Sequence, residues 1–141
     1  MKQRVGASQA GQRASEKPSA RTRYFRDLLV WQKGMKLARA VYAATGTFPK
    51  AEMFGLTSQM RRASLSVPSN IAEGHGRLSD GSLRVFLGQA RGSLYELETQ
   101  IELACDLEYL QAKEAKELLE LSREVGRMLN GLIGGSGQLT C

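Results

Sequence analysis

The sequence has little of what enzyme sites and disulfide frameworks are built from. Its 141 residues include one histidine, two cysteines and three prolines, and aromatic residues make up 6%. A single histidine leaves no pair for a zinc site and little support for acid–base or nucleophilic catalysis. Cys105 lies inside a helical pattern and Cys141 is the last residue, which indicates neither a disulfide framework nor a metal site. We therefore expect no enzyme activity, no metal and no cofactor, in a reducing cytoplasm.

Long apolar runs are also absent. No segment approaches the roughly 20 apolar residues that a membrane helix needs, and no apolar stretch follows Lys2 and Arg4. We expect neither export nor a membrane anchor. The length suits one domain, and 42% hydrophobic with 24% charged residues is an ordinary globular composition.

Charge is distributed unevenly along the chain. Residues 1–23 hold six basic groups against one acidic group, residues 24–78 eight against three, and residues 79–141 six against ten. A basic surface favours phosphate backbones or acidic partners, and opposite signs also favour pairing of helices within or between subunits.

Composition divides the chain into three parts. Residues 1–22 are rich in Gly, Ser, Ala, Gln and basic groups and cannot bury enough apolar surface to offset ordering, so we expect a flexible basic tail. Residues 24–133 carry helical patterns, and the glycine-rich residues 134–141 are expected to be a flexible end.

The first helix is predicted over residues 27–45. The second is predicted to begin near residue 52 and to continue to residue 73, where Gly74 and Gly76 end it. The apolar stripe of the first helix has the 3,4 spacing of one helix face. Its members are Leu28, Trp31, Met35, Ala38 and Tyr42, with Leu37 and Val41 beside them. Pro68 interrupts the second pattern, and we expect one kinked helix rather than two.

Two further helices are predicted after residue 78. Ser79 and Asp80 form an N-cap for the third helix. Its stripe is Phe86, Ala90, Ser93, Leu97, Ile101 and Ala104, and its small residues Gly88, Ala90, Gly92 and Ser93 predict close contact with another helix. The fourth helix covers about residues 112–132, with the stripe Leu118, Leu121, Val125, Met128 and Leu132 and with Leu129 alongside. Four such helices predict an all-α, antiparallel up-down-up-down four-helix bundle.

The residues that could take part in catalysis or metal binding have ordinary structural explanations. His75 lies between two glycines and is expected to be a surface-loop residue. Glu98 and Glu102 share a helix face, but the Glu-x-x-His motif of di-metal bundles is missing, which favours a charged face pairing with basic groups.

The basic residues of the first two helices are the remaining candidate site. They can form a positive surface that contacts phosphates without sequence specificity; the alternative is a solvated face balanced by the acidic helices. The candidates for nucleic-acid binding are Lys33, Lys36, Arg39, Arg61, Arg62 and Arg77, with Arg26 nearby.

Several strings in order along the chain carry a family resemblance. They are residues 28–33 (LLVWQK), 48–49 (FP), 54–63 (FGLTSQMRRA), 66–74 (SVPSNIAEG) and 90–100 (ARGSLYELETQ). Across residues 24–133 the chain resembles the four-helix-bundle family of proteins encoded in intervening sequences of bacterial 23S rRNA genes, which is related to the accessory variability determinant of diversity-generating retroelements.

The resemblance implies a homopentameric ring, and the accessory determinant binds nucleic acid and a reverse transcriptase. Within the 66–74 string, it marks Pro68, Asn70, Glu73 and Gly74 as either packing devices or part of a binding surface. Glu108 stands where the family often has glycine, so we expect a departure at that turn.

Two functions follow as hypotheses. The first is a non-enzymatic, oligomeric protein that binds RNA or DNA through its basic surface. The alternative is a protein-interaction adaptor or scaffold that recruits an enzyme partner.

Overall fold

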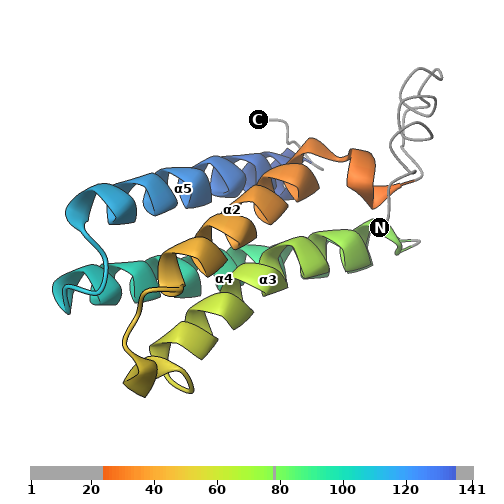
Figure 1. Ribbon diagram of the computed structural model, residues 1–141. Helices are drawn as coiled ribbons and strands as arrows, with labels where there is room; N and C mark the ends of the chain where they lie inside the picture. Colours follow the sequence, from red (N-terminus) through yellow and green to blue (C-terminus); the bar gives the residue numbers. More distant parts are fainter. Residues whose placement is uncertain (1–23, 78, 136–141) are drawn as a thin grey trace, which may run out of the picture.

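The computed structural model describes residues 24–77 and 79–135, and these residues form helices without strands. The four main helices are α2 (Leu29–Thr45), α3 (Leu56–His75), α4 (Asp80–Asp106) and α5 (Ala112–Gly135), preceded or separated by the short 3-10 segments η1 (Phe25–Asp27) and η2 (Lys50–Glu52) (Figure 1). The predicted tail over residues 1–22 and residues 136–141 of the predicted C-terminal end lie outside the described residues.

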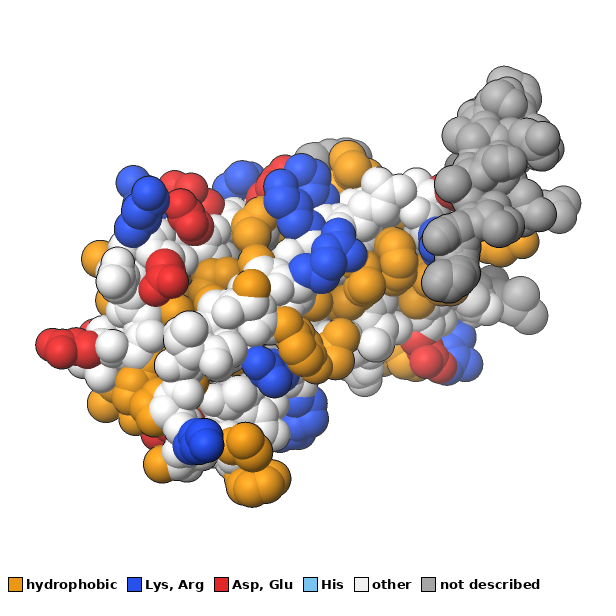
Figure 2. Space-filling view, viewed as in Figure 1, with side chains coloured by type: hydrophobic (Ala, Val, Ile, Leu, Met, Phe, Trp, Pro, Cys, Tyr) orange, Lys and Arg blue, Asp and Glu red, His pale blue; other side chains and the backbone are white. Residues whose placement is uncertain are grey.

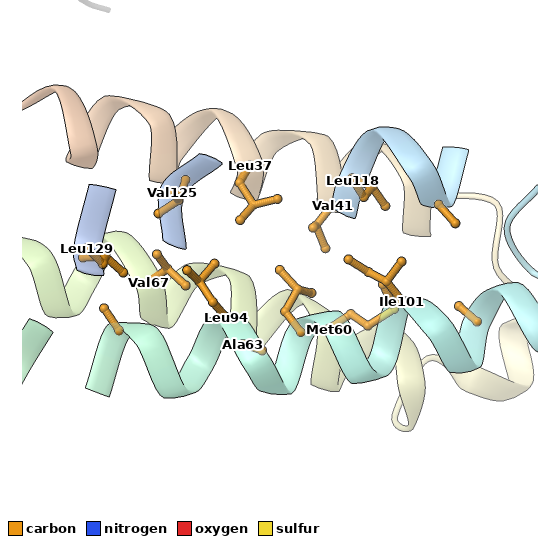
Figure 3. Close-up of a cluster of buried hydrophobic side chains, with 14 of the residues drawn as sticks. Leu37, Val41, Met60, Ala63, Val67, Leu94, Ile101, Leu118, Val125 and Leu129 are labelled. Carbon is orange, nitrogen blue, oxygen red and sulfur yellow. The ribbon is translucent and has the colours of Figure 1, made fainter. Parts of the chain in front are cut away.

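The helices pack around one core. α2 contacts α3, α3 contacts α4, α4 contacts α5, and α5 returns to contact α2. Figure 3 shows side chains from all four helices directed into the space between them. The predicted all-helical fold is therefore confirmed. Within the described ranges, no helix is both long enough and apolar enough to cross a bilayer.

The core on α2 differs from the predicted stripe. Leu37 and Val41 are fully buried and Val30 is nearly so, whereas Tyr42, predicted to be a stripe member, is 40% exposed. The predicted stripe and the residues that are buried both repeat with helical spacing, but the two series are centred on different sides of α2. The prediction was wrong for Tyr42 because α2 turns the side that carries Leu37 and Val41 toward the other helices.

The same displacement occurs on α5. Val125 and Leu129 are buried, but Leu132 is 52% exposed. The helix also continues to Gly135, past its predicted end at residue 132. On α4 the prediction holds better, because Ala90, Leu97, Ile101 and Ala104 of the predicted stripe are fully buried, with Leu87 and Leu94 beside them.

The start of α3 is set by Glu52. One carboxylate oxygen accepts a hydrogen bond from the backbone N–H of Leu56 at 3.0 Å, and the other accepts one from the hydroxyl of Tyr109 at 2.9 Å. Glu52 therefore satisfies a free donor at the helix N-terminus and ties it to the connection between α4 and α5. Residue 52 itself belongs to η2, so α3 begins later than predicted.

Two other predicted features of the helix boundaries are present. α3 runs as one helix through Pro68, and the Ser79 hydroxyl caps α4 by accepting from the N–H of Ser82 at 3.1 Å. His75 is the last residue of α3 rather than part of the loop in which we expected it.

The turn after α4 has a conformation that favours glycine, although residue 108 is a glutamate. Glu108 has φ 66°, in the left-handed region. The N–H of Tyr109 donates to Ala104 O at 2.9 Å and that of Glu108 to Cys105 O at 3.0 Å, the two bonds of a Schellman motif. Glu108 thus adopts the left-handed conformation that glycine favours, at a cost of about 1–2 kcal/mol for a residue with a side chain.

Candidate nucleic-acid interface

Two of the candidate lysines meet α5. Lys33 Nζ lies 3.0 Å from Glu124 Oε2, and both side chains remain partly exposed, at 29% and 38%. Lys36 and Arg127 are also near enough for their charges to act on the Glu124 carboxylate. We call Lys33, Lys36, Glu124 and Arg127 the α2–α5 seam. In this seam Lys33 contacts the carboxylate of Glu124, and the charges of Lys36 and Arg127 act on it from nearby.

The electrostatics of the seam are visible in its acidic member. The hydrogen bond from Lys33 is the main cause that lowers the pKa of Glu124; desolvation opposes it, and the charges of Lys33, Lys36 and Arg127 lower the pKa further. Glu124 is therefore held ionised, and the seam keeps a surplus of positive charge. Arg39, which is exposed, follows Lys36 by three residues and so lies on the same side of α2.

Arg61 and Arg62 do not form a common patch. Neighbouring residues point about 100° apart around a helix. Arg61 turns toward α2, where its Nε donates to Thr45 Oγ1 at 2.8 Å and its Nη2 to Tyr42 O at 3.3 Å, and its guanidinium lies 4.6 Å from the centre of the Tyr42 ring. These contacts place a cation at the C-terminus of α2, which stabilises that helix end. Arg62 is exposed and bonds Gln59 at 3.1 Å.

Arg77 follows the other end of α3. Its Nη2 lies 2.6 Å from Glu73 Oε2, and its guanidinium lies 4.6 Å from the centre of the Phe86 ring on α4. Sixteen positions separate it from Arg61, or about 24 Å along a helix. Arg77 therefore belongs to a different part of the surface from Arg61.

The structure thus divides the predicted basic surface. Figure 2 shows Lys and Arg side chains scattered over the face that carries α2, with apolar side chains and carboxylates between them. Lys33 and Lys36 are brought together, and the structure adds Arg127, which sequence reasoning missed. Periodicity places Arg127 on the polar side of α5 but does not reveal which helix lies beside it.

The 66–74 string is accounted for largely by packing. Pro68 is buried against Gly34 of α2, where an added Cβ on the glycine would lie 3.6 Å from the proline Cβ. At Gly74, an added Cβ would lie 3.0 Å from Phe86 Cβ and 3.2 Å from Leu83 Cδ1. Pro68 and Gly74 therefore set the approach of α3 to its two neighbours.

Asn70 takes part in a polar link between α3 and α4. Its Nδ2 donates to Ser66 O at 2.8 Å and to Ser66 Oγ at 2.9 Å, and Ser93 Oγ of α4 donates to Ser66 Oγ at 2.8 Å. Glu73 pairs with Arg77 at the end of α3. These contacts favour the interpretation of the string as a packing device.

Metal-binding chemistry has no support in the described part of the chain. Across residues 24–77 and 79–135, no three His, Cys, Asp or Glu side chains gather closely enough to hold an ion. Glu98, one of the paired carboxylates, accepts a hydrogen bond from the buried Ser122 hydroxyl of α5 at 2.6 Å instead of pairing with a basic group there.

The fold defines the class, a protein of four long helices without strands in the described residues. Residues 26–131 match the profile of the family described as 23S rRNA-intervening sequence protein. The chain belongs to this family.

A solved structure supports the fold. The chain is similar to a protein of unknown function from the S23 ribosomal protein family of Bacteroides thetaiotaomicron, with a TM-score of 0.68 and 22% identity over 74% of this chain and 98% of the other. No curated protein matches the sequence. Neither the family nor this structural relative is described as an enzyme.

Proposed function

We propose that this protein is a non-enzymatic, oligomeric bundle that binds RNA or DNA through the α2–α5 seam. The observation that carries the proposal is the ion pair of Lys33 with Glu124 at 3.0 Å, with Lys36 and Arg127 close enough for their charges to lower the pKa of the same carboxylate. Cations gathered on an exposed surface suit the phosphates of a nucleic-acid backbone, which they contact without reading sequence.

Among the candidate residues, those of α2 have the greatest freedom to reach a phosphate. Lys36 and Arg39 are exposed, and Lys33 is held by one partly exposed ion pair, which contributes little to stability. Arg61 is fixed by its bonds to Thr45 and Tyr42. We therefore rank the seam and Arg39 above Arg61, Arg62 and Arg77 as phosphate contacts.

The proposal includes an assembly and a place of action. The short connections and the contacts between consecutive helices support an antiparallel up-down-up-down order. We further propose a cytoplasmic homopentamer related to the accessory variability determinant, in which copies of the seam along one surface would add their charges. The free thiol of Cys105 fits a reducing compartment.

The test is fluorescence anisotropy of labelled RNA and DNA at two salt concentrations, with the full chain and with a chain that begins at Tyr24. Three phosphate contacts predict that affinity falls with salt with a log–log slope of about −2 to −3. The double variant Lys33→Glu/Lys36→Glu should bind at least tenfold more weakly, or about 1.4 kcal/mol. Glu124→Gln should bind more tightly, because it removes the one opposing charge of the seam.

The matched control is Lys113→Glu, an exposed charge reversal about 21 Å from Arg127 along α5. It changes the net charge as each seam reversal does but leaves the seam intact, so its effect should be small. If Lys113→Glu and the single variant Lys36→Glu lose affinity for nucleic acid equally, binding depends on the net charge of the protein and not on the seam. Binding lost with residues 1–23 would move the function to the tail, and no binding by either chain would reject the proposal.

A further inference from the structure

The outward side of α4 combines exposed apolar residues with glycines. Val85, Tyr95 and Leu103 are 57%, 54% and 46% exposed. Between them, a Cβ added at Gly88 or at Gly92 would meet no heavy atom within 4 Å. The positions follow one another by helical spacing and so share a side of the helix. We call Val85, Gly88, Gly92, Tyr95, Thr99 and Leu103 the α4 outer face.

These glycines have no packing partner within the described chain. Each costs the helix about 1 kcal/mol relative to alanine. The predicted close contact at the small residues holds for Ala90, which is fully buried, and for Ser93, which bonds Ser66. It fails for Gly88 and Gly92, because they face away from the other three helices. The helix surface between Val85 and Tyr95 therefore carries no side chain at these two positions.

A second exposed apolar feature lies between η2 and α3. Phe54 is 92% exposed and Met53 is 52% exposed. We call these two residues the apolar knob. At the end of the molecule that carries η2 and the start of α3, Figure 2 shows hydrophobic side chains that protrude beside Lys and Arg side chains. An aromatic side chain exposed to this degree is the kind of residue that anchors protein interfaces.

The charges around the knob are opposite to those on the C-terminal half of α4. The knob has the exposed Lys50 and Arg62 close to it in sequence, and Glu96, Glu102 and Asp106 are exposed on the part of α4 that carries Tyr95 and Leu103, whereas the basic residues Arg84 and Arg91 belong to the N-terminal half of the helix. Complementary charges of this kind orient two surfaces and suppress wrong pairings.

We propose that the apolar knob of one copy docks on the α4 outer face of a second copy. Phe54 packs over Gly92 beside Tyr95, where the missing side chain lets the ring approach the helix, and Lys50 faces the carboxylates that follow along α4. The interface is head-to-tail, so each copy offers its own α4 outer face to the next, and such an interface closes into a ring when the rotation allows it.

A two-fold pairing of α4 with α4 would leave the knob of both copies exposed. The head-to-tail arrangement covers both apolar features with one contact.

This inference rests on the proposed self-assembly but not on nucleic-acid binding. It is tested by light scattering coupled to size-exclusion chromatography, over a dilution series of the nuclease-treated full chain. Phe54→Ser removes the aromatic side chain of the knob, and Gly92→Leu places a bulky side chain, from a residue that favours helix, where Phe54 is proposed to dock. Each variant should associate at least tenfold more weakly than the wild type. Leu29→Ser, at an exposed apolar site on α2, and Gly134→Leu, at an open glycine on α5, are the matched controls and should assemble normally.

Mixing the two variants makes the test specific to the head-to-tail interface. Phe54→Ser keeps an intact α4 outer face and Gly92→Leu keeps an intact knob, so an equimolar mixture should form a dimer that neither variant forms alone. Failure of the mixture to pair, with both variants monomeric, would overturn the head-to-tail contact in favour of a self-complementary one. Normal assembly of both variants would overturn this interface and leave the proposed oligomer standing. A wild-type chain that is monomeric throughout would reject the oligomer and, with it, this interface.

Discussion

Gly74 and Gly88 are both glycines inside helices, but they have different surroundings. At Gly74 of α3, an added Cβ would press against Phe86 and Leu83 of α4, whereas at Gly88 of α4 it would meet nothing within 4 Å. The first glycine is explained by the fold of one chain and the second is not. Glycine content alone therefore does not identify close helix packing, because the same residue also occurs on faces that the chain leaves open.

The largest expected effect in this comparison is at Gly74. The new methyl group of Gly74→Ala would lie 3.0 Å from Phe86 Cβ and would force α3 and α4 apart. Overpacking of this kind destabilises by about 1–3 kcal/mol, which exceeds the gain in helix propensity. Urea unfolding followed by circular dichroism measures the change. The Phe54→Ser background keeps association from contributing to it, and an unchanged midpoint would mean that the two helices can separate freely.

Gly88→Ala and Gly92→Ala should act in the opposite direction. In the same Phe54→Ser background, each should stabilise the fold by about 0.5–1 kcal/mol, because alanine is the better helix former and the added methyl meets no neighbour. The same denaturation experiment measures the gain. A loss of stability at either position would show that the α4 outer face is covered within the chain, and the contrast with Gly74 would disappear.

The sequence predicted the helices better than it predicted their orientation. In four long segments the apolar residues recur with the 3.6-residue period of a helix, and Ser79 is a recognisable N-cap. These features follow from local chemistry. Tyr42 was placed in the core because α2 has apolar residues on more than one side. Which side is buried depends on the neighbouring helices, which periodicity does not contain.

The candidate site shows the same limit. Lys33, Lys36, Arg61 and Arg62 were grouped only because they are basic residues of the first two predicted helices. The contact of Lys33 with Glu124 joins the first long helix to the last, and no local pattern encodes it. Arg61 and Arg62 are adjacent in sequence, but their side chains lie on different sides of α3.

A third glycine gives the smallest expected effect and a different readout. An added Cβ at Gly55 would lie 2.8 Å from the Glu52 carboxylate, the movable end of a side chain. The bond from the Leu56 N–H and then that from Tyr109 lower the pKa of Glu52. Its stabilising contribution is therefore present above its unfolded-state pKa and is lost as the pH falls through the lower folded-state pKa. Glu52→Gln and Gly55→Ala should both flatten the dependence of stability on pH between roughly pH 5 and 3.

Thermal unfolding across that pH range measures the effect. Glu117→Gln, an exposed carboxylate on α5, is the control and should leave the slope as it is in the wild type. A wild-type slope in Glu52→Gln would show that this carboxylate contributes equally in both protonation states. A wild-type slope in Gly55→Ala alone would show that the carboxylate moves without losing its bonds.

The Glu124 carboxylate at the centre of the α2–α5 seam has a consequence for how the surface responds to its surroundings. Because neighbouring cations lower the pKa of Glu124, acidification within the physiological range leaves this carboxylate ionised. The negative charge at the centre of the seam is thus insensitive to cellular pH. Ionic strength, which screens exposed charges over about 8–10 Å, is the variable to which this surface can respond.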